Sequence, residues 1–191
     1  MKKILMIAVM AVAAVSANAQ WWIGGEIGLN TTGGSIKNKI ADVTVTADKT
    51  TNVDFTIAPE IGYNINDNWA VAAKLVFKHD EYNGGITNSF NINPYVRYTF
   101  VKAGNFSVFC DGGVSYGISH DKGDNANTNN LSVGLNPGIS YAISPKVGLV
   151  AHIGDLSYNT SWYKDGDYKN TDNKFNVGLW NSISFGAYYN F

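Results

Sequence analysis

Six ionisable residues occupy related places in segments that otherwise alternate between apolar and small polar residues. They are Glu26, Glu60, Lys74, Arg97, Asp111 and His152. Each belongs to the polar set of its segment, and side chains of an extended strand point alternately to two faces. Most lie five residues from one end of the segment, as Glu26 does from Trp21. In strands tilted by about 40° that distance is on the order of 12 Å. We therefore predict that the six charges form one layer.

Such a layer has two chemical interpretations. Buried charges must pair, and removing one partner of a buried pair costs about 3–5 kcal/mol. A row of ionisable groups is also what a proton or ion pathway would need. We favour the structural interpretation, an interior ion-pair layer, and keep the pathway as its alternative.

Two further histidines lie near hydroxyl and acidic residues. His79 precedes Asp80 and Glu81, and His120 stands between Ser119 and Asp121. A histidine with a serine and an acid is the composition of a nucleophilic site, but no spacing here matches a nucleophile motif. We expect no catalytic residue.

Two acidic loop segments have the donor chemistry of Ca²⁺ sites. They are 121–124 (Asp-Lys-Gly-Asp) and 165–167 (Asp-Gly-Asp). Neither fits the EF-hand spacing, and solvated turns are the better interpretation. We expect no metal and no cofactor.

Eight alternating segments must position these residues. We predict strands over 21–30, 53–65, 69–79, 89–100, 106–118, 131–143, 147 to about 158, and about 174 to 191. Short turns follow the second, fourth and sixth strands, and long polar loops follow the others; the first loop, 31–52, has its own alternation, so strands one and two are expected to extend into it. A repeated unit begins at Pro59, Pro94, Pro137 and Phe185. We expect bulges beside the three prolines and near Asn181, because proline lacks the N–H that a ladder needs.

An even number of strands joined in this way predicts an all-β fold, an eight-stranded antiparallel up-and-down barrel. A lipocalin-like barrel would turn the apolar faces inward, whereas a transmembrane β-barrel turns them to lipid. The few charges all lie on the opposite face, so we predict the membrane barrel. Cys110 then faces lipid. Interfacial aromatics are expected at the short-turn end (Trp21, Tyr63, Trp69, Tyr98, Tyr141, Tyr189) and the other end (Phe77, Phe90, Tyr116).

Composition limits the remaining possibilities. Residues 1–19 have a basic start, an apolar stretch and a small-residue cleavage site, which predicts a signal peptide and a barrel domain over 20–191. Residues 20–191 carry 12 basic and 15 acidic residues, a formal charge of −3, with no basic patch, so a nucleic-acid partner is not expected. The single cysteine excludes an intrachain disulfide.

The last segment carries a terminal pattern. Ser184, Gly186, Tyr189 and Phe191 match the spacing of a C-terminal assembly signal of outer-membrane barrels. With the eight segments, this chain resembles the outer membrane protein β-barrel domain family, the small OmpA/OmpX-like barrels. The resemblance implies location in the cell outer membrane, both termini in the periplasm, contact with lipid and lipopolysaccharide, and insertion by the barrel-assembly machinery.

The resemblance leaves several functions open. We expect a side-chain-plugged barrel with a structural or surface-interaction role through loops 31–52 and 159–173. The second loop and the residue before it are rich in aromatics (Tyr158, Trp162, Tyr163, Tyr168), which would contact a partner or prolong the upper aromatic band. The alternatives are a narrow porin-like channel and a lipid A-modifying enzyme, because some eight-stranded barrels are lipid A palmitoyltransferases or deacylases.

Overall fold

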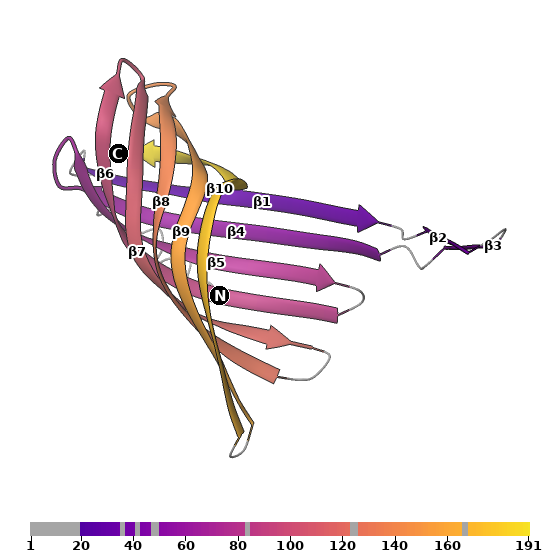
Figure 1. Ribbon diagram of the computed structural model, residues 1–191. Helices are drawn as coiled ribbons and strands as arrows, with labels where there is room; N and C mark the ends of the chain where they lie inside the picture. The colour runs from indigo at the N-terminus through magenta and orange to yellow at the C-terminus, as the bar shows by residue number, and fades with distance from the viewer. Residues whose placement is uncertain are drawn as a thin grey trace, which may run out of the picture.

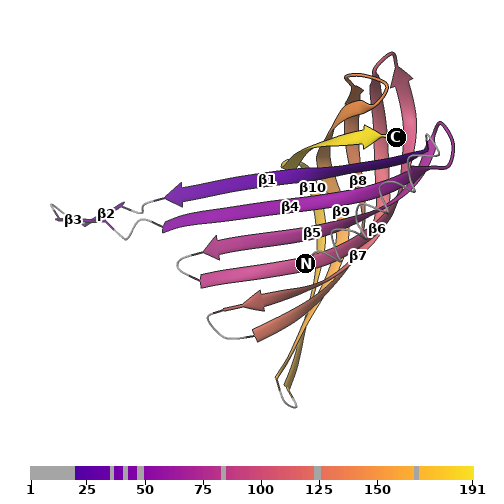
Figure 2. The same cartoon turned by 180° about the vertical axis from the view of Figure 1, so that it is seen from behind.

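Eight strands close into one antiparallel barrel, and two short strands form a separate hairpin (Figures 1 and 2). The computed structural model describes residues 20–191, apart from 35–36, 41–42, 47–49, 83–84, 123–125 and 166–167, so the expected signal peptide lies outside the described residues. The barrel strands are β1 (Trp21–Gly34), β4 (Thr50–Asn64), β5 (Trp69–Tyr82), β6 (Gly85–Ala103), β7 (Phe106–Asp121), β8 (Ala126–Ala142), β9 (Val147–Asp165) and β10 (Tyr168–Asn190). The hairpin is β2 (Lys37–Ile40) with β3 (Val43–Thr46).

The predicted fold class and the orientation of the faces are confirmed. Large apolar side chains lie outside, for example Phe77 at 44% and Val133 at 54% exposure, whereas Trp22 (4%) and Phe109 (1%) lie inside. This is the reverse of a soluble protein, in which such residues form the core. The lipocalin-like alternative is therefore excluded. The described part of the chain contains no helix long and apolar enough to cross a membrane.

The two ends of the barrel differ in their connections. At the short-turn end, the turn after β4 is closed by Asn66, whose Oδ1 accepts the amide of Asn68 at 2.9 Å. The turn after β6 uses Gly104, whose φ of 59° suits glycine. The first and last barrel strands meet at this same end, where the amide of Phe191 donates to the carbonyl of Trp21 at 3.1 Å.

At the opposite, long-hairpin end, most residues of the last three predicted polar loops belong to paired strands, so the predicted strand ends were wrong there. Most of 159–173 lies in β9 and β10, which pair as far as Asp165 opposite Tyr168. The same holds for 80–88 and 119–130, whose described residues lie largely in β5 to β8. In the first loop the prediction that the flanking strands extend is confirmed, because β1 continues to Gly34 and β4 begins at Thr50. The β2–β3 hairpin lies between them. The prediction placed the strand ends where the apolar residues stop. Backbone pairing nevertheless continues through the polar residues that follow, because the hydrogen bonds of the ladder join main-chain groups.

Bulges occur at only some of the predicted places. The β8–β9 register shifts between Leu135 and Gly138, across Pro137, and the β9–β10 register shifts between Leu179 and Ser184, across Asn181. The prediction of bulges beside Pro59 and Pro94 was wrong. Ladder pairs are missing there, but the register is the same on both sides, because proline removes one donor without adding a residue. An unpredicted shift lies at Phe100, between Thr99 and Val101.

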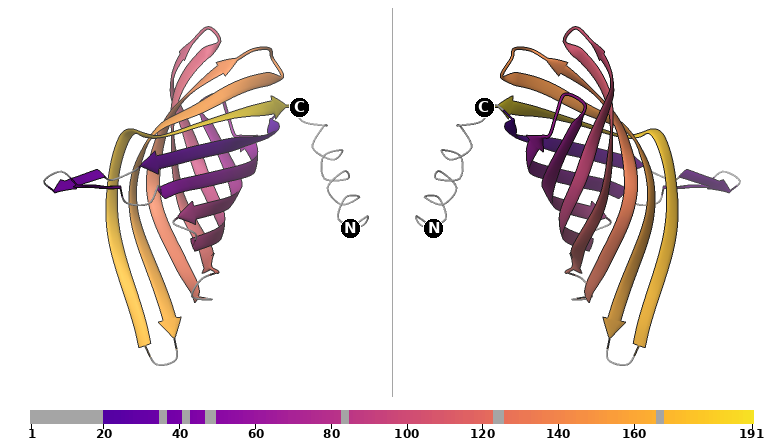
Figure 3. Two further views of the ribbon diagram at one scale, coloured as in Figure 1. Left: turned by 90° about the vertical axis from the view of Figure 1, so that its right-hand side faces the viewer. Right: turned by 90° about the vertical axis from the view of Figure 1, so that its left-hand side faces the viewer.

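The closure of the barrel is partial along its length. β1 pairs with β4 along its whole length, from Trp21 opposite Tyr63 to Gly34 opposite Thr50. Its pairing with β10 ends much sooner, at Ile27 opposite Phe185. Beyond this pair β10 bends away from β1, as both views in Figure 3 show. The barrel is thus closed in the short-turn half and has diverging walls in the long-hairpin half.

Candidate interior ion-pair site

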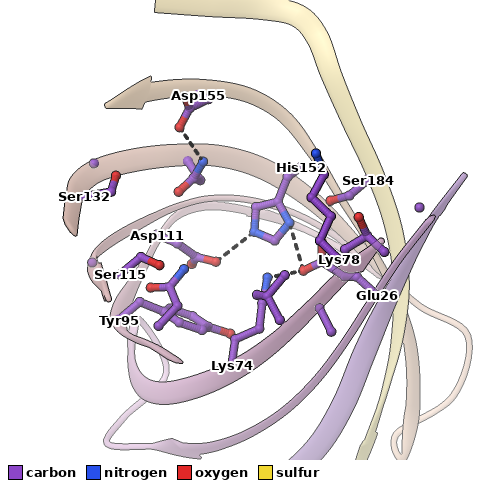
Figure 4. Close-up of a pocket in the computed structure, with 18 of the residues that line it drawn as sticks. Glu26, Lys74, Lys78, Tyr95, Asp111, Ser115, Ser132, His152, Asp155 and Ser184 are labelled. Carbon is purple, nitrogen blue, oxygen red and sulfur yellow. Dashed lines mark hydrogen bonds and ion pairs between the residues drawn. The ribbon is translucent and has the colours of Figure 1, made fainter. Parts of the chain in front are cut away.

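Lys74 links the carboxylates of two neighbouring strands. It lies opposite Glu60 in the β4–β5 ladder, with its Nζ 3.7 Å from Glu60 Oε2. The same Nζ makes an ion pair with Glu26 of β1 (Figure 4). Inward positions at one height on β1, β4 and β5 therefore bring two acids onto one ammonium group.

His152 extends this contact across the barrel. Its Nδ1 lies 3.2 Å from Glu26 Oε1, and its Nε2 lies 2.8 Å from Asp111 Oδ2 (Figure 4). Asp111 also accepts two hydrogen bonds from its ladder partner Arg97, from Nε at 2.7 Å and Nη2 at 2.8 Å. The structure thus brings all six residues singled out from the sequence into one connected network.

The network is balanced in charge when His152 is protonated. Both of its ring nitrogens face a carboxylate oxygen, and imidazole donates from both nitrogens only as the cation. Three cations then meet the three anions Glu26, Glu60 and Asp111, which are only 7%, 6% and 4% exposed. A neutral sum reduces the cost of holding these charges away from water.

Three inward aromatic residues, which were not singled out from the sequence, complete the layer. The Cζ of Arg97 lies 3.9 Å from the ring centroid of Phe109 and 5.6 Å from that of Trp22. The hydroxyl of Tyr95 donates to Glu60 Oε2 at 2.7 Å. A signal was present, since Trp22, Tyr95 and Phe109 are large aromatics at inward positions where neighbouring residues are mostly small or polar.

This layer lies between two interior cavities. The cavity on the long-hairpin side has a volume of about 670 Å³ and is lined by Lys74, Asp111 and His152, among others. The cavity on the short-turn side, about 390 Å³, is lined by Arg97 and Trp22. The bidentate Arg97–Asp111 pair therefore joins one residue of each cavity.

The candidate catalytic residues are not assembled into a nucleophilic site. His79 Nδ1 lies 2.7 Å from Asn88 Oδ1, and His120 Nδ1 lies 2.9 Å from Asn127 Oδ1. Ser119 hydrogen-bonds Ser89 and Asn130 instead of a histidine. The histidine rings belong to the outward-facing set of positions.

The acidic segments do not form a metal site in the described part of the chain, where no group of three or more His, Cys, Asp or Glu side chains is placed to hold a metal ion. Asp121 ends β7 and accepts a hydrogen bond from Thr87 Oγ1 at 3.3 Å. Residues 123, 124, 166 and 167 lie outside the described residues.

The four residues of the terminal pattern take different places. The hydroxyl of Ser184 donates to Glu26, so this residue joins the interior network. Gly186 is in close contact with β1, since a Cβ there would lie 2.5 Å from the carbonyl oxygen of Gly25. Tyr189 and Phe191 pack edge to face with ring centroids 5.4 Å apart. Their role as an assembly signal remains a prediction.

Aromatic residues also gather at both ends of the outer wall. At the short-turn end Trp69 and Tyr98 have ring centroids 4.5 Å apart. Towards the long-hairpin end, Phe77 lies 5.1 Å from Phe90, and Tyr116 lies 6.4 Å from Trp162. Trp162 thus continues the upper aromatic band. Cys110, on the outward set, is half-buried.

The chain was compared with protein families, curated sequences and solved structures. A family model described as "Outer membrane protein beta-barrel domain" matches residues 4–191. A search of curated protein sequences gives no significant match. Among solved structures, Neisserial surface protein A is 15% identical with a TM-score of 0.51, over 90% of this chain and 97% of that chain. The beta domain of the Bordetella autotransporter Brka is 12% identical (TM-score 0.46, 91% and 68% covered), and Ail of Yersinia pestis is 14% identical (TM-score 0.36, 90% and 99% covered).

Proposed function

Because this chain belongs to the outer membrane protein β-barrel domain family, we propose that it is a small integral outer-membrane barrel with a plugged interior and a structural or surface-interaction role. The observation that carries the proposal is the ion-pair and aromatic layer between the two cavities. An eight-stranded barrel is just wide enough for side chains to fill it. In this barrel the side chains of the ion-pair network and of the aromatic residues beside it fill the cross-section between the two cavities.

Single-channel recording of the purified protein in planar bilayers tests the plug. We expect no steady conductance. The double variant Arg97→Ser/Asp111→Ser, which removes the pair shared by the two cavities, should conduct, whereas the exposed variant Lys146→Ser should stay silent. Steady unitary conductance of the unmodified protein would instead support the narrow-channel alternative.

The surface role rests on the long-hairpin end. The β2–β3 hairpin and the β9–β10 hairpin extend from it, in the segments 31–52 and 159–173 that we propose as contact sites for lipopolysaccharide or a surface partner (Figure 1). The termini and short turns are proposed to face the periplasm. Cysteine placed at Gly104 or in the β9–β10 hairpin, in a Cys110→Ser background, tests this orientation in whole cells. Labelling at Gly104 by a membrane-impermeant reagent would contradict it.

We propose no catalytic role. His79 and His120 each contact an asparagine, and Ser119 contacts Ser89 and Asn130, so none of the three is arranged as a nucleophile and its base. Mass spectrometry of lipid A from cells with and without the gene tests the lipid A-modifying alternative. A loss or gain of one acyl chain would overturn the proposal.

A further inference from the structure

We propose that the long-hairpin half of the barrel has a lateral opening between β1 and β10. Through it a membrane amphiphile places a zwitterionic phosphoethanolamine headgroup in the larger cavity while its hydrocarbon tail stays in the bilayer. This goes beyond the plugged structural role, because it assigns a ligand to the cavity above the ion-pair network. A plug that stops passage along the barrel axis does not stop access from the side.

The opening follows from the pairing of the two strands. The last β1–β10 pair is Ile27 opposite Phe185, although β1 pairs with β4 as far as Gly34 and β10 pairs with β9 as far as Tyr168. The two strands diverge from this point (Figure 3). In lipid, an unpaired strand edge leaves backbone donors and acceptors without partners at a high free-energy cost. An occupant with polar atoms would reduce that cost.

The outer rim of the opening is apolar. Ile27 of β1 is 67% exposed, and on β10 Val177 is 67% and Phe185 65% exposed. Val133, on the fully paired part of the wall, is 54% exposed. Ile27 and Phe185 form the last pair of the ladder, so the neighbouring strand is lost on the long-hairpin side of them, and their side chains are more exposed than that of Val133. A hydrocarbon tail lying along the rim would cover them.

The space behind the rim is polar and reaches the opening. The cavity of about 670 Å³ is lined by Ile27 and Gly28 from β1 and by Ile183 and Ser184 from β10, so both sides of the opening form its wall. Hydroxyl and amide side chains line much of the remainder (Thr56, Asn93, Ser115, Ser132, Asn136, Ser157). An apolar rim before a polar cavity suits an amphiphile.

Outside the ion-pair network the charged residues that line the cavity are Asp54, Lys78 and Asp155. The headgroup is matched to Asp155 and Lys78. Asp155 accepts hydrogen bonds from Asn136 Nδ2 at 3.2 Å and Ser157 Oγ at 2.7 Å, and among the described residues no cation lies within ion-pair distance of it. Lys78 lines the same cavity with a side chain 44% exposed, paired with Asp80 at 2.7 Å (Figure 4). The ammonium group of a zwitterion would neutralise Asp155, and its phosphate would face Lys78.

A reversible lock of the opening provides the test. Gly28 and Ser184 are the residues that would pair next if the β1–β10 ladder continued, and a Cβ at Gly28 comes no nearer than 3.5 Å to Thr56. In a Cys110→Ser background, Gly28→Cys/Ser184→Cys should form a disulfide that closes the opening. Calorimetric titration with lysophosphatidylethanolamine in non-ionic detergent should give saturable, one-to-one binding to the reduced form. Oxidation should weaken it about tenfold or more.

Matched variants separate the opening from side effects. Cys110→Ser alone, oxidised, should bind as the unmodified protein does. Asp155→Asn should weaken binding of lysophosphatidylethanolamine but should not weaken any binding of lysophosphatidylglycerol, since the latter has no ammonium group and carries a net negative charge. Binding that does not saturate, or that is unaffected by the lock, would overturn the proposal. So would sedimentation showing a dimer that only the reduced protein forms, because a second copy would then occupy the opening.

Discussion

His152 joins the two halves of the interior network. Glu60, Lys74 and Glu26 lie on one side of it, and Asp111 with Arg97 on the other. The sequence predicted these six residues because each is an ionisable member of the polar set of its segment, at a similar height. It did not predict Tyr95, Phe109 or Ser184 as partners, since the stagger between strands decides which inward residues meet.

Replacing Arg97 should destabilise the barrel strongly. Arg97→Ala leaves the buried Asp111 with His152 but without its bidentate donor, and uncovers the ring of Phe109. The expected loss is about 3–5 kcal/mol in the free energy of unfolding. Urea unfolding in lipid vesicles measures it. Lys146→Ala, at an exposed turn, should change stability little, and equal effects of the two variants would contradict this account.

Removing one hydroxyl tests the neutral part of the network. Tyr95→Phe keeps the ring but deletes the donor to Glu60 Oε2, and in the described part of the chain Glu60 Oε1 already has no hydrogen-bond partner. We expect a loss of about 1–3 kcal/mol in the same unfolding measurement. The control is Tyr141→Phe on the outer wall, where the side chain is 51% exposed. If Tyr95→Phe left the free energy of unfolding unchanged, the hydroxyl of Tyr95 would contribute nothing to stability.

At the scale of elements, alternation predicted strand existence and faces but neither strand ends nor register shifts. The shift opposite Pro137 changes which residues of β9 face inward. On the short-turn side of the shift, Val150 (2% exposed) and His152 (7%) are buried. On the long-hairpin side, Ser157 (6%) is buried while Leu156 (38%) is exposed. Proline predicted the position of only one register shift. A register changes only where one strand has an extra residue, and the strands have none at Pro59 and Pro94.

Deleting Phe191 should impair insertion before it affects any other property. Its amide donates to Trp21, and its ring packs on Tyr189 at the end where β10 meets β1. We expect less protein in the outer membrane and more in the periplasm, measured by fractionation. Phe100→Ser removes an aromatic with 51% exposure from the same end of another strand and serves as the control. Similar losses for both would argue for general apolar contact instead of a terminal signal.

At the scale of the molecule, the sequence predicted the barrel, its strand number and its outward apolar faces. The diverging walls in the long-hairpin half were not predicted. Strand order and polarity do not encode how far two particular edges remain paired. That distance depends on the irregularity between Leu179 and Ser184, which lets β10 bend.

The closed, edge-paired wall in the short-turn half should resist denaturing detergent. Unheated protein in dodecyl sulfate should migrate differently on a gel from boiled protein, because unfolding requires the whole ladder to separate. The locked Gly28→Cys/Ser184→Cys form should need a higher temperature for conversion than its reduced form. Identical migration before and after boiling would contradict a closed barrel.

The hydrogen bond between Ser184 and Glu26 joins residues separated by 158 positions. Neighbouring hairpins can form as soon as their own residues are present, but this contact must wait for both ends of the chain. We therefore expect topology to set the order of folding, with a growing sheet that has two open edges first and its closure last. During that interval β1 and β10 can each pair with a foreign strand. The time spent before closure, more than the stability of the finished barrel, would then set how often the chain aggregates.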